Sequence, residues 1–273
     1  MNRFAHLDDK KLKPGYRFIR HLVWMFSPKY KIYGEENLPE DGPCVIVGNH
    51  SHMYGPIAGE LYIPGKHATW CIGDMMDPKT VSAYAYRDFW SKKPLWIRWF
   101  FKILSYIIPP IADIVFNSAH TIPVYHDMRI VKTFKETTEE LSKGVRVVIF
   151  PECYDEYNNI VHMFQNRFID IAKMYRKKTG KDLTFVPMYL APLLKRIEFG
   201  KPIKFDSEVP AEEERERIAK YLMDEITALA AALPEHTVVP YPNVSKKHYP
   251  KSLPIVNLTS GTASDDNKEK DLQ

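Results

Sequence analysis

The alternation of short β-branched runs with longer helical patterns is the feature that most limits what this chain can fold into. Apolar runs typical of buried strands occur at residues 44–47 (CVIV), 121–125 (TIPVY), 145–150 (VRVVIF) and 184–189 (TFVPMY), with a weaker one at 201–205. Helical patterns occupy residues 130–143, 164–178 and 211–233, and Gly144 and Gly180 are stop signals for the first two. Strands separated by helices predict an α/β fold in which flanking helices cover a mixed central sheet.

The two ends of the chain differ from this alternating region. Residues 1–33 are basic and amphipathic and predict a membrane-contact segment, whereas residues 34–233 predict the α/β domain. Residues 234–258 are rich in proline and lysine, which predicts an irregular segment, and the polar residues 259–273 predict a disordered tail. A hydrophobic content of 45% excludes a wholly disordered chain, and three widely spaced cysteines exclude a disulfide framework.

Positive charge gathers where aromatic residues gather. Residues 1–31 carry eight Lys or Arg against two Asp, and residues 85–102 carry five against one Asp, although the net charge of the chain is only +4. Two segments, 16–26 and 95–108, also place apolar residues at helical spacing: Ile19, Leu22, Val23 and Phe26 in the first, and Trp96, Trp99, Phe100, Ile103 and Ile107 in the second. These patterns predict helices that contact an anionic lipid surface, with a core helix as the alternative for residues 95–108.

The location of the protein is predicted from the same features. No secretory signal opens the chain, and no run reaches the roughly 18 consecutive apolar residues of a simple transmembrane span. We therefore expect a cytoplasmic protein bound peripherally to the inner face of the cell membrane. No pattern typical of nucleic-acid binding accompanies the basic residues, so nucleic acid is not an expected partner.

The first loop that contains candidate catalytic side chains follows the run CVIV. The chain leaves this strand through Gly48 and presents Asn49, His50, Ser51 and His52. A histidine at a strand end is a natural general base, because a neutral imidazole is available near pH 7. The alternatives are a structural histidine, a metal site and a nucleophilic Ser51. The metal site lacks a third ligand at a suitable spacing, and Ser51 lacks the surrounding glycines of a nucleophile elbow.

The second loop that contains candidate catalytic side chains follows the run VRVVIF. Pro151 cannot continue the hydrogen-bonding ladder, so the carboxylate of Glu152 is expected at the edge of the sheet, beside the first loop. Cys153 is the other reactive group here. Its neighbours in the sequence, Glu152, Asp155 and Glu156, are acidic and do not stabilise a thiolate, so Cys153 is not expected to act as a nucleophile.

Four blocks of the sequence, in order, resemble the glycerophospholipid acyltransferase family, which includes the lysophosphatidate acyltransferases. The blocks are NLPEDGPCVIVGNHSHMYGP, NSAHTIPVYHDMR, VVIFPECYDEYNNIVHMFQNRFIDIA and FVPMYLAP. Together they extend from about residue 34 to residue 192. The resemblance implies an acyltransferase-like fold.

The resemblance also implies a reaction and the residues that perform it. The implied reaction moves a fatty acyl group from an acyl thioester, on coenzyme A or acyl carrier protein, to a hydroxyl of a glycerophosphate or lysophospholipid. The implied catalytic residues are His50, as general base, and Glu152, in the acceptor loop. The implied substrate-binding residues are Asn49, His52, His126, Arg129 and Pro151, with His126 where the family usually has an arginine and Arg129 as its substitute. No metal and no cofactor beyond the thioester co-substrate are implied.

This sequence departs from the family pattern at both loops. Gly55 stands where the family has the aspartate that orients the histidine, and Tyr154-Asp155-Glu156 stands where Thr-Arg-Ser normally follows. Three interpretations stay open. Glu152, Asp155 or Asp74 replaces the missing aspartate; or the chain is a catalytically degenerate lipid-binding or scaffold paralogue; or the acyl acceptor carries no phosphate.

Overall fold

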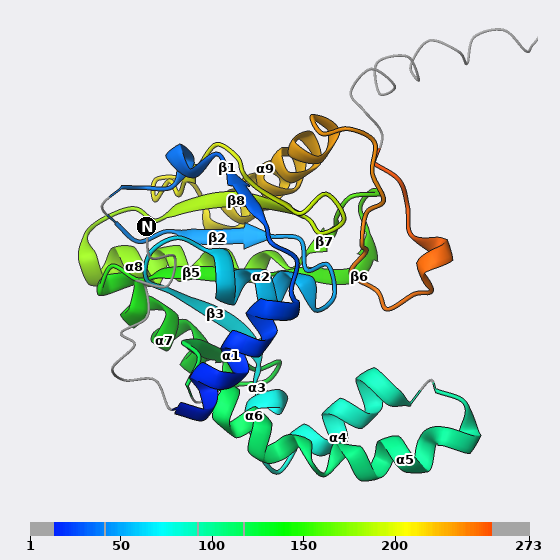
Figure 1. Cartoon of the computed structure of the whole chain (residues 1–273). Coiled ribbons are helices and arrows are strands. Elements are labelled where there is room, and N and C mark those ends of the chain that lie inside the picture. The colour runs from blue at the N-terminus through cyan, green and yellow to red at the C-terminus, as the bar shows by residue number, and fades with distance from the viewer. Residues whose placement is uncertain (1–13, 41, 92, 117, 253–273) are drawn as a thin grey trace, which may run out of the picture.

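A central sheet of eight strands organises the molecule (Figure 1). The computed structural model describes residues 14–40, 42–91, 93–116 and 118–252. The strand order is β1-β9-β8-β2-β5-β3-β4, and β10 pairs with β8. The strands are β1 (Lys31–Tyr33), β2 (Val45–Gly48), β3 (His67–Ile72), β4 (Thr121–Val124), β5 (Arg146–Ile149), β8 (Thr184–Ala191), β9 (Arg196–Phe199) and β10 (Ile203–Lys204).

The sheet is mixed, as the sequence predicts. Strand β2 is parallel to both β5 and β8, and β3 is parallel to β5 and β4. Strands β9 and β10 each run antiparallel to β8. All four residues of β2 are buried, and a strand covered on both faces requires a continuous apolar run such as VIVG.

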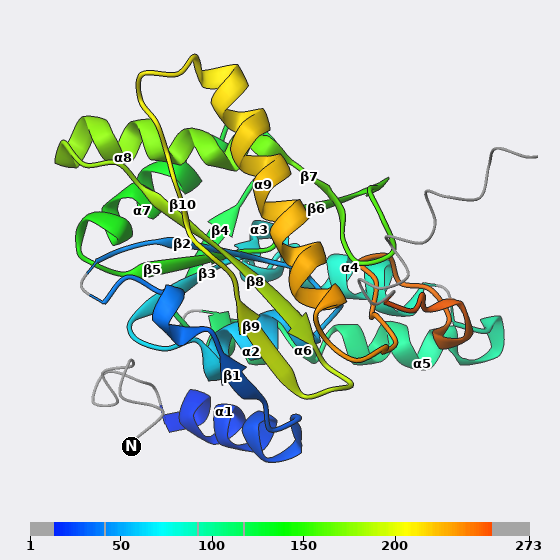
Figure 2. The ribbon, with the colours of Figure 1, turned by 90° about the horizontal axis from the view of Figure 1, so that it is seen from above.

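Helices cover both faces of the sheet (Figure 2). On one face lie α7 (Ile130–Ser142), α8 (Ile171–Thr179) and α9 (Ala211–Ala231), which enclose the larger hydrophobic core. On the other face, α1 (Pro14–Phe26) and α2 (Tyr54–Tyr62) pack over a second core. Burial of apolar side chains against both faces of the sheet stabilises this three-layer arrangement.

The connection between β3 and β4 is helical and extends away from the sheet (Figure 1). It contains α3 (Gly73–Met76), α4 (Val81–Ala85), a π-helical turn (Tyr86–Trp90), α5 (Leu95–Ser105) and α6 (Ile108–Phe116). In the described part of the chain, no single helix is long and apolar enough to cross a membrane. Helices α5 and α6 reach that length and hydropathy only together, with a bend of 52° between them.

Two further segments lie beyond the carboxyl ends of the central strands. Strands β6 (Glu152–Glu156) and β7 (His162–Phe164) form an antiparallel hairpin directly after β5. Residues 234–252 follow α9 as an irregular segment, with a 3₁₀ turn at Lys246–His248 and an isolated bridge between Thr237 and Lys251. Both segments border the loop that follows β2, as the contacts below show.

The structure contains the five expected strands and the expected helices, with two differences. Residues 31–33, expected in the N-terminal membrane-contact segment, form strand β1 and pair with β9. The helix expected over 164–178 begins late, because β7 ends at Phe164 and a 3₁₀ turn, Asn166–Asp170, precedes α8. The predicted tail, 259–273, lies outside the described residues, as do residues 1–13 and 253–258.

Candidate active site

The loop after β2 is fixed to β8 by a buried side chain. The Asn49 amide donates to the Leu190 carbonyl oxygen at 3.0 Å, and the Leu190 N–H donates to Asn49 Oδ1 at 2.7 Å. These bonds lock the start of the loop at the carboxyl end of the strands. Asn49 is 1% exposed, so in this structure it clamps the loop and has no surface left for the substrate contact that the sequence predicts.

The two residues after His50 have an uncommon backbone conformation. Ser51 and His52 have φ values of 46° and 52°, in the left-handed region that residues other than glycine seldom adopt. Such a conformation costs of order 1–3 kcal/mol and persists only where the surroundings enforce it. The loop is therefore held in one shape by its neighbours, and that shape places the His50 ring.

Glu152 connects the two loops through the backbone of His50 and not through its imidazole ring. Its carboxylate accepts a hydrogen bond from the His50 backbone N–H at 2.5 Å and another from the His162 backbone N–H at 2.9 Å. Burial raises the pKa of Glu152 to about 7, although both N–H donors favour the ionised form. The expected proximity of the two loops is confirmed, and the geometry of Glu152 is that of a positioning residue.

The His50 ring is held by aromatic side chains. Phe150 and Tyr241 each pack against the imidazole, edge to face, with ring centroids 5.6 Å from its own. The Nδ1 atom is buried and has no hydrogen-bond partner in the described part of the chain. Burial lowers the pKa of His50 to about 4, so the imidazole is neutral at pH 7.

None of the three acidic residues considered as substitutes for the missing aspartate hydrogen-bonds this ring. Glu152 is engaged by two backbone N–H groups, as described above. Asp155 is exposed on β6, and Asp74 lies on α3 after strand β3. The contacts of the imidazole ring with Phe150 and Tyr241 are instead aromatic.

Gly55 is required by the close approach of α2 to the loop. Its N–H donates to the His50 carbonyl oxygen at 3.1 Å. A Cβ atom at Gly55 would lie 2.2 Å from that oxygen and 3.2 Å from the Phe150 ring. The first turn of α2 thus occupies the space that a side chain would need, and an aspartate here does not fit this backbone.

The segment after α9 covers the loop, which the sequence gives no sign of. The Ser51 hydroxyl donates to the Val239 carbonyl oxygen at 3.4 Å, and His52 Nε2 lies 2.9 Å from the Pro242 carbonyl oxygen. Tyr241, between them, contacts the rings of His50, His162 and Tyr154. We call residues 238–242 the covering strap. His52, expected to bind substrate, is here bonded to this strap.

Of the remaining predicted site residues, Pro151 lies between Phe150 and Glu152, which both contact His50, whereas His126 and Arg129 lie apart from it. Pro151 is buried, and its carbonyl oxygen accepts from the Gln165 N–H at 2.9 Å. His126 and Arg129 are exposed after β4, and Arg129 pairs with Asp127 at 2.7 Å. Because β5 and β3 lie between β2 and β4, about 14 Å of sheet separates the strand ends. The structure does not bring His126 or Arg129 against the imidazole.

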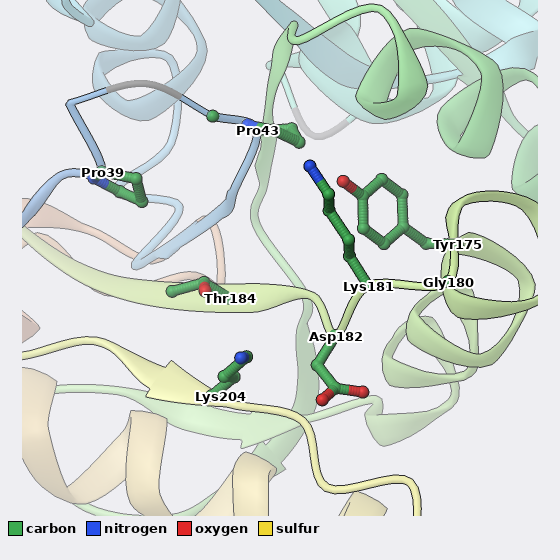
Figure 3. Close-up of a pocket in the computed structure, with 9 residues that line it drawn as sticks. Pro39, Pro43, Tyr175, Gly180, Lys181, Asp182, Thr184 and Lys204 are labelled. Atoms are coloured by element: carbon green, nitrogen blue, oxygen red, sulfur yellow. The ribbon is translucent and has the colours of Figure 1, made fainter.

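A surface depression of about 490 Å³ lies at the amino ends of β2 and β8, whereas His50 lies beyond the carboxyl end of β2 (Figure 3). It is lined by Pro43, which precedes β2, and by Thr184, which begins β8, together with Lys181 and Asp182. His50 follows the other end of β2, so this depression is separate from the candidate site. In the described residues, no three His, Cys, Asp or Glu side chains are grouped as metal ligands would be.

Residues 29–191 match the family model described as Acyltransferase, which is more than half of the chain. The chain belongs to the acyltransferase family. The matched region contains His50, Gly55 and Glu152, whereas α9 and the covering strap lie beyond it.

Two known proteins resemble this chain. A lyso-glycine lipid O-acyltransferase from Phocaeicola vulgatus is 39% identical over 66 residues, which are 22% of this chain and 22% of that protein. The chain therefore matches only about a fifth of the length of this relative. The crystal structure of the 1-acyl-sn-glycerophosphate acyltransferase PlsC from Thermotoga maritima aligns with a TM-score of 0.43 and 20% identity, over 83% of this chain and 85% of that one.

The acid side of the acyltransferase's pH profile is expected to report Glu152 rather than His50. Above about pH 7 the Glu152 carboxylate is ionised and accepts both backbone N–H groups; below it, protonation removes one acceptor. His50 gains its proton only near pH 4. We expect kcat/KM of the parent to fall as the pH decreases below about 7. In Glu152→Gln, the residual kcat/KM should not show this decrease. An identical acid limb in both proteins would contradict this assignment.

A side chain at Gly55 is expected to destabilise the acyltransferase. Gly55→Ala should lower the free energy of unfolding by about 1–3 kcal/mol, the usual cost of overpacking. Gly55→Asp should be at least as destabilised and no more active, because α2 must move to admit the carboxylate. The matched control is Gly59→Ala on the same helix, where a Cβ atom meets its nearest neighbours at 3.7 Å and stability should be kept or raised.

Chemical denaturation of the three variants measures this difference. A Gly55→Asp protein that is as stable as the parent and more active would show that α2 yields and that the carboxylate orients His50 after all.

Proposed function

We propose that this acyltransferase moves a fatty acyl group from an acyl thioester to a hydroxyl of a lysolipid, with His50 as general base. The proposal is carried by one observation: a neutral, half-buried imidazole stands at the carboxyl end of a central strand, on a loop clamped from three sides. Ligands of α/β sheets bind beyond the carboxyl ends of the strands.

The reaction follows from a base in this position. His50 accepts the hydroxyl proton while the hydroxyl oxygen attacks the thioester carbonyl carbon. The carbon–sulfur bond then breaks, and the leaving thiolate takes the proton from the imidazolium. General-base catalysis of this kind contributes about 10²–10⁴-fold to a rate.

The absence of a carboxylate at position 55 has a consequence for rate. In a catalytic triad, removal of the group that fixes the histidine tautomer costs about 10⁴-fold. Here the Phe150 and Tyr241 rings restrict the imidazole, but neither stabilises the imidazolium as an anion does. We therefore propose an enzyme with a modest turnover, because the imidazolium that forms when His50 accepts the proton has no anion hydrogen-bonded to it among the described residues.

The donor and acceptor are proposed at the level of chemical class. By the family resemblance, the donor is an acyl thioester of coenzyme A or acyl carrier protein, and the acceptor is a glycerophosphate or lysophospholipid. His126 and Arg129 are the proposed phosphate contacts.

A second acceptor class, a lysolipid without a phosphate, is favoured by the charges near the site. Asp155 and Glu156 are exposed on β6, beside the covering strap that Tyr154 contacts, and they would repel a phosphate. The Phocaeicola vulgatus relative is named a lyso-glycine lipid O-acyltransferase, and the acceptor in that name favours this second class.

The experiment that tests the function is a panel assay. The purified full chain is incubated with acyl-CoA or acyl carrier protein thioester and one acceptor at a time: glycerol 3-phosphate, lysophosphatidate, or lysolipids without phosphate. Thiol release is followed continuously, and the acylated product is identified by mass spectrometry. Thiol release that depends on an acceptor hydroxyl is the expected result. Release that is independent of every acceptor, or none at all, would overturn the proposal.

A further inference from the structure

Large apolar side chains are exposed along three helices of the described chain. On α5, Leu95, Trp96, Trp99 and Ile103 are 58–77% exposed. Phe18 and Phe26 on α1 are 64% and 83% exposed, and Ile107 and Ile111 beside and on α6 about half. We call these eight side chains the apolar face. Patches of this size on a soluble surface mark a site of contact with a partner or a membrane.

Helix α5 exposes mainly apolar side chains, whereas a surface helix of a soluble domain exposes mainly polar ones. Its inward side contains Ser105, which is buried, and Phe101, whose ring stacks on Trp90 with centroids 5.4 Å apart. Its outward side is almost entirely apolar, whereas a surface helix in water turns its polar side outward. The composition of this outward side is suited to an apolar environment.

The three helices are linked through α6, which contacts α1 and follows α5. Helix α1 lies against α6, since a Cβ atom at Gly15 would contact Ile114 at 3.6 Å, and α5 meets α6 at the 52° bend. Figure 1 shows α1, α6 and α5 along its lower side, away from α9. Both views place α5 on the side toward which β2 points (Figures 1 and 2). His50 follows the end of β2, which is Gly48.

The charged residues on α1 and α5 are all basic, whereas α6 contains one partly exposed acid, Asp113. Helices α1 and α5 contain no Asp or Glu. Lys93 and Lys102 are exposed at the two ends of α5, with Arg98 between them, and Arg17 is exposed on α1. Long basic side chains that flank apolar and tryptophan side chains are suited to the boundary between acyl chains and anionic headgroups.

The lengths of the helices decide how they meet a bilayer. Helix α5 has 11 residues, about 16 Å, and the hydrocarbon core of a bilayer is about 30 Å thick. Neither α5 nor α6 can span it alone, and the 52° bend between them prevents the pair from forming one straight helix. A shallow position within one leaflet fits both facts.

We propose that the apolar face of α1, α5 and α6 inserts into one leaflet of a bilayer that contains anionic lipids, with Lys93, Arg98 and Lys102 at the headgroups. This surface goes beyond acyl transfer at His50. It places the carboxyl end of the sheet beside the bilayer, so that a lysolipid has a short path to the site.

Flotation of the full chain with vesicles tests the proposal without an acyl donor, so that its outcome is independent of catalysis. The vesicles are phosphatidylcholine alone or with 30 mol% phosphatidylglycerol (about a third anionic lipid, enough to attract basic residues). We expect binding to the anionic vesicles that weakens with salt. Trp96→Ser/Trp99→Ser/Ile103→Ser should bind at least about 100-fold more weakly, whereas the control Val131→Ser/Leu193→Ser, which removes exposed apolar residues elsewhere, should bind like the parent.

Two further variants separate charge from insertion. Lys93→Gln/Arg98→Gln/Lys102→Gln should lose the preference for anionic vesicles, whereas Lys173→Gln/Lys177→Gln/Lys178→Gln on α8 should keep it. Brominated acyl chains should quench tryptophan fluorescence in the parent but much less in Trp96→Phe/Trp99→Phe, which still binds. Equal binding by the serine variant and the parent would overturn the proposal, as would a stable dimer in which Trp96 and Trp99 are shielded and vesicles are not bound.

Discussion

Replacing His50 by alanine is expected to lower kcat for acyl transfer by about 10²–10⁴-fold, the range that a general base contributes. The KM for the lysolipid should change little, because the neutral ring acts on the proton of the hydroxyl and not on the rest of the acceptor. The protein should remain folded, since the ring is only half-buried and the loop bonds to Glu152 come from the backbone. The measurement is steady-state thiol release with a saturating acyl thioester.

The matched control is His120→Ala. This histidine precedes β4 at the opposite edge of the sheet and pairs with Glu140 at the surface. We expect unchanged kcat and a stability loss of no more than about 1 kcal/mol. Should His50→Ala retain the parent's kcat, His50 would not be the base, and the reaction would need another proton acceptor.

Replacing Glu152 by alanine is expected to damage both stability and turnover. Two buried backbone N–H groups, those of His50 and His162, lose their acceptor, at about 1–3 kcal/mol each. The loop with its left-handed Ser51 and His52 then loses one of the contacts that hold its shape. We expect a lower denaturation midpoint and a loss of kcat at least as large as 10-fold, the effect of about 1.4 kcal/mol on a barrier.

Glu152→Gln separates positioning from proton transfer. The glutamine amide keeps one acceptor oxygen, so a positioning residue should be partly preserved and the loss should be smaller than in Glu152→Ala. If Glu152 itself carried a proton in the reaction, both variants would be equally inactive. Glu156→Gln, exposed on the same strand, is the control and should behave like the parent.

The central strands and the meeting of the two loops could be predicted from the sequence, because burial on both faces demands an unbroken apolar run. Strands β2 and β5 have such runs, and parallel neighbours bring their carboxyl ends to one edge. His50 and Glu152, each just beyond such an end, therefore had to lie close together.

Other elements carry no such pattern. Strands β1 and β9, at one edge of the sheet, contain Lys31, Arg196 and Glu198, and short edge strands of this kind do not alternate clearly. The covering strap has no secondary structure of its own, and its contacts with Ser51 and His52 depend on where α9 ends. Nothing local in its sequence indicates that it lies over the site.

Gly55 shows why a departure from a family motif is hard to interpret without coordinates. In the sequence alone, Gly55 is a position at which the aspartate of the family pattern is missing. In the structure it is a contact between the first turn of α2 and the His50 carbonyl that only glycine allows. The position of α2 depends on the packing of Ala58, Leu61 and Tyr62 in the core, which no short motif encodes.

Chemical rescue of His50→Ala by free imidazole tests most directly whether the work of His50 is to accept a proton. The truncated side chain leaves space between Phe150 and Tyr241 that imidazole can enter. We predict that acylated product, counted by mass spectrometry, increases with imidazole concentration and with the fraction of imidazole that is neutral. A variant that binds the lysolipid normally but shows no response to imidazole, or one that needs none, would contradict the account.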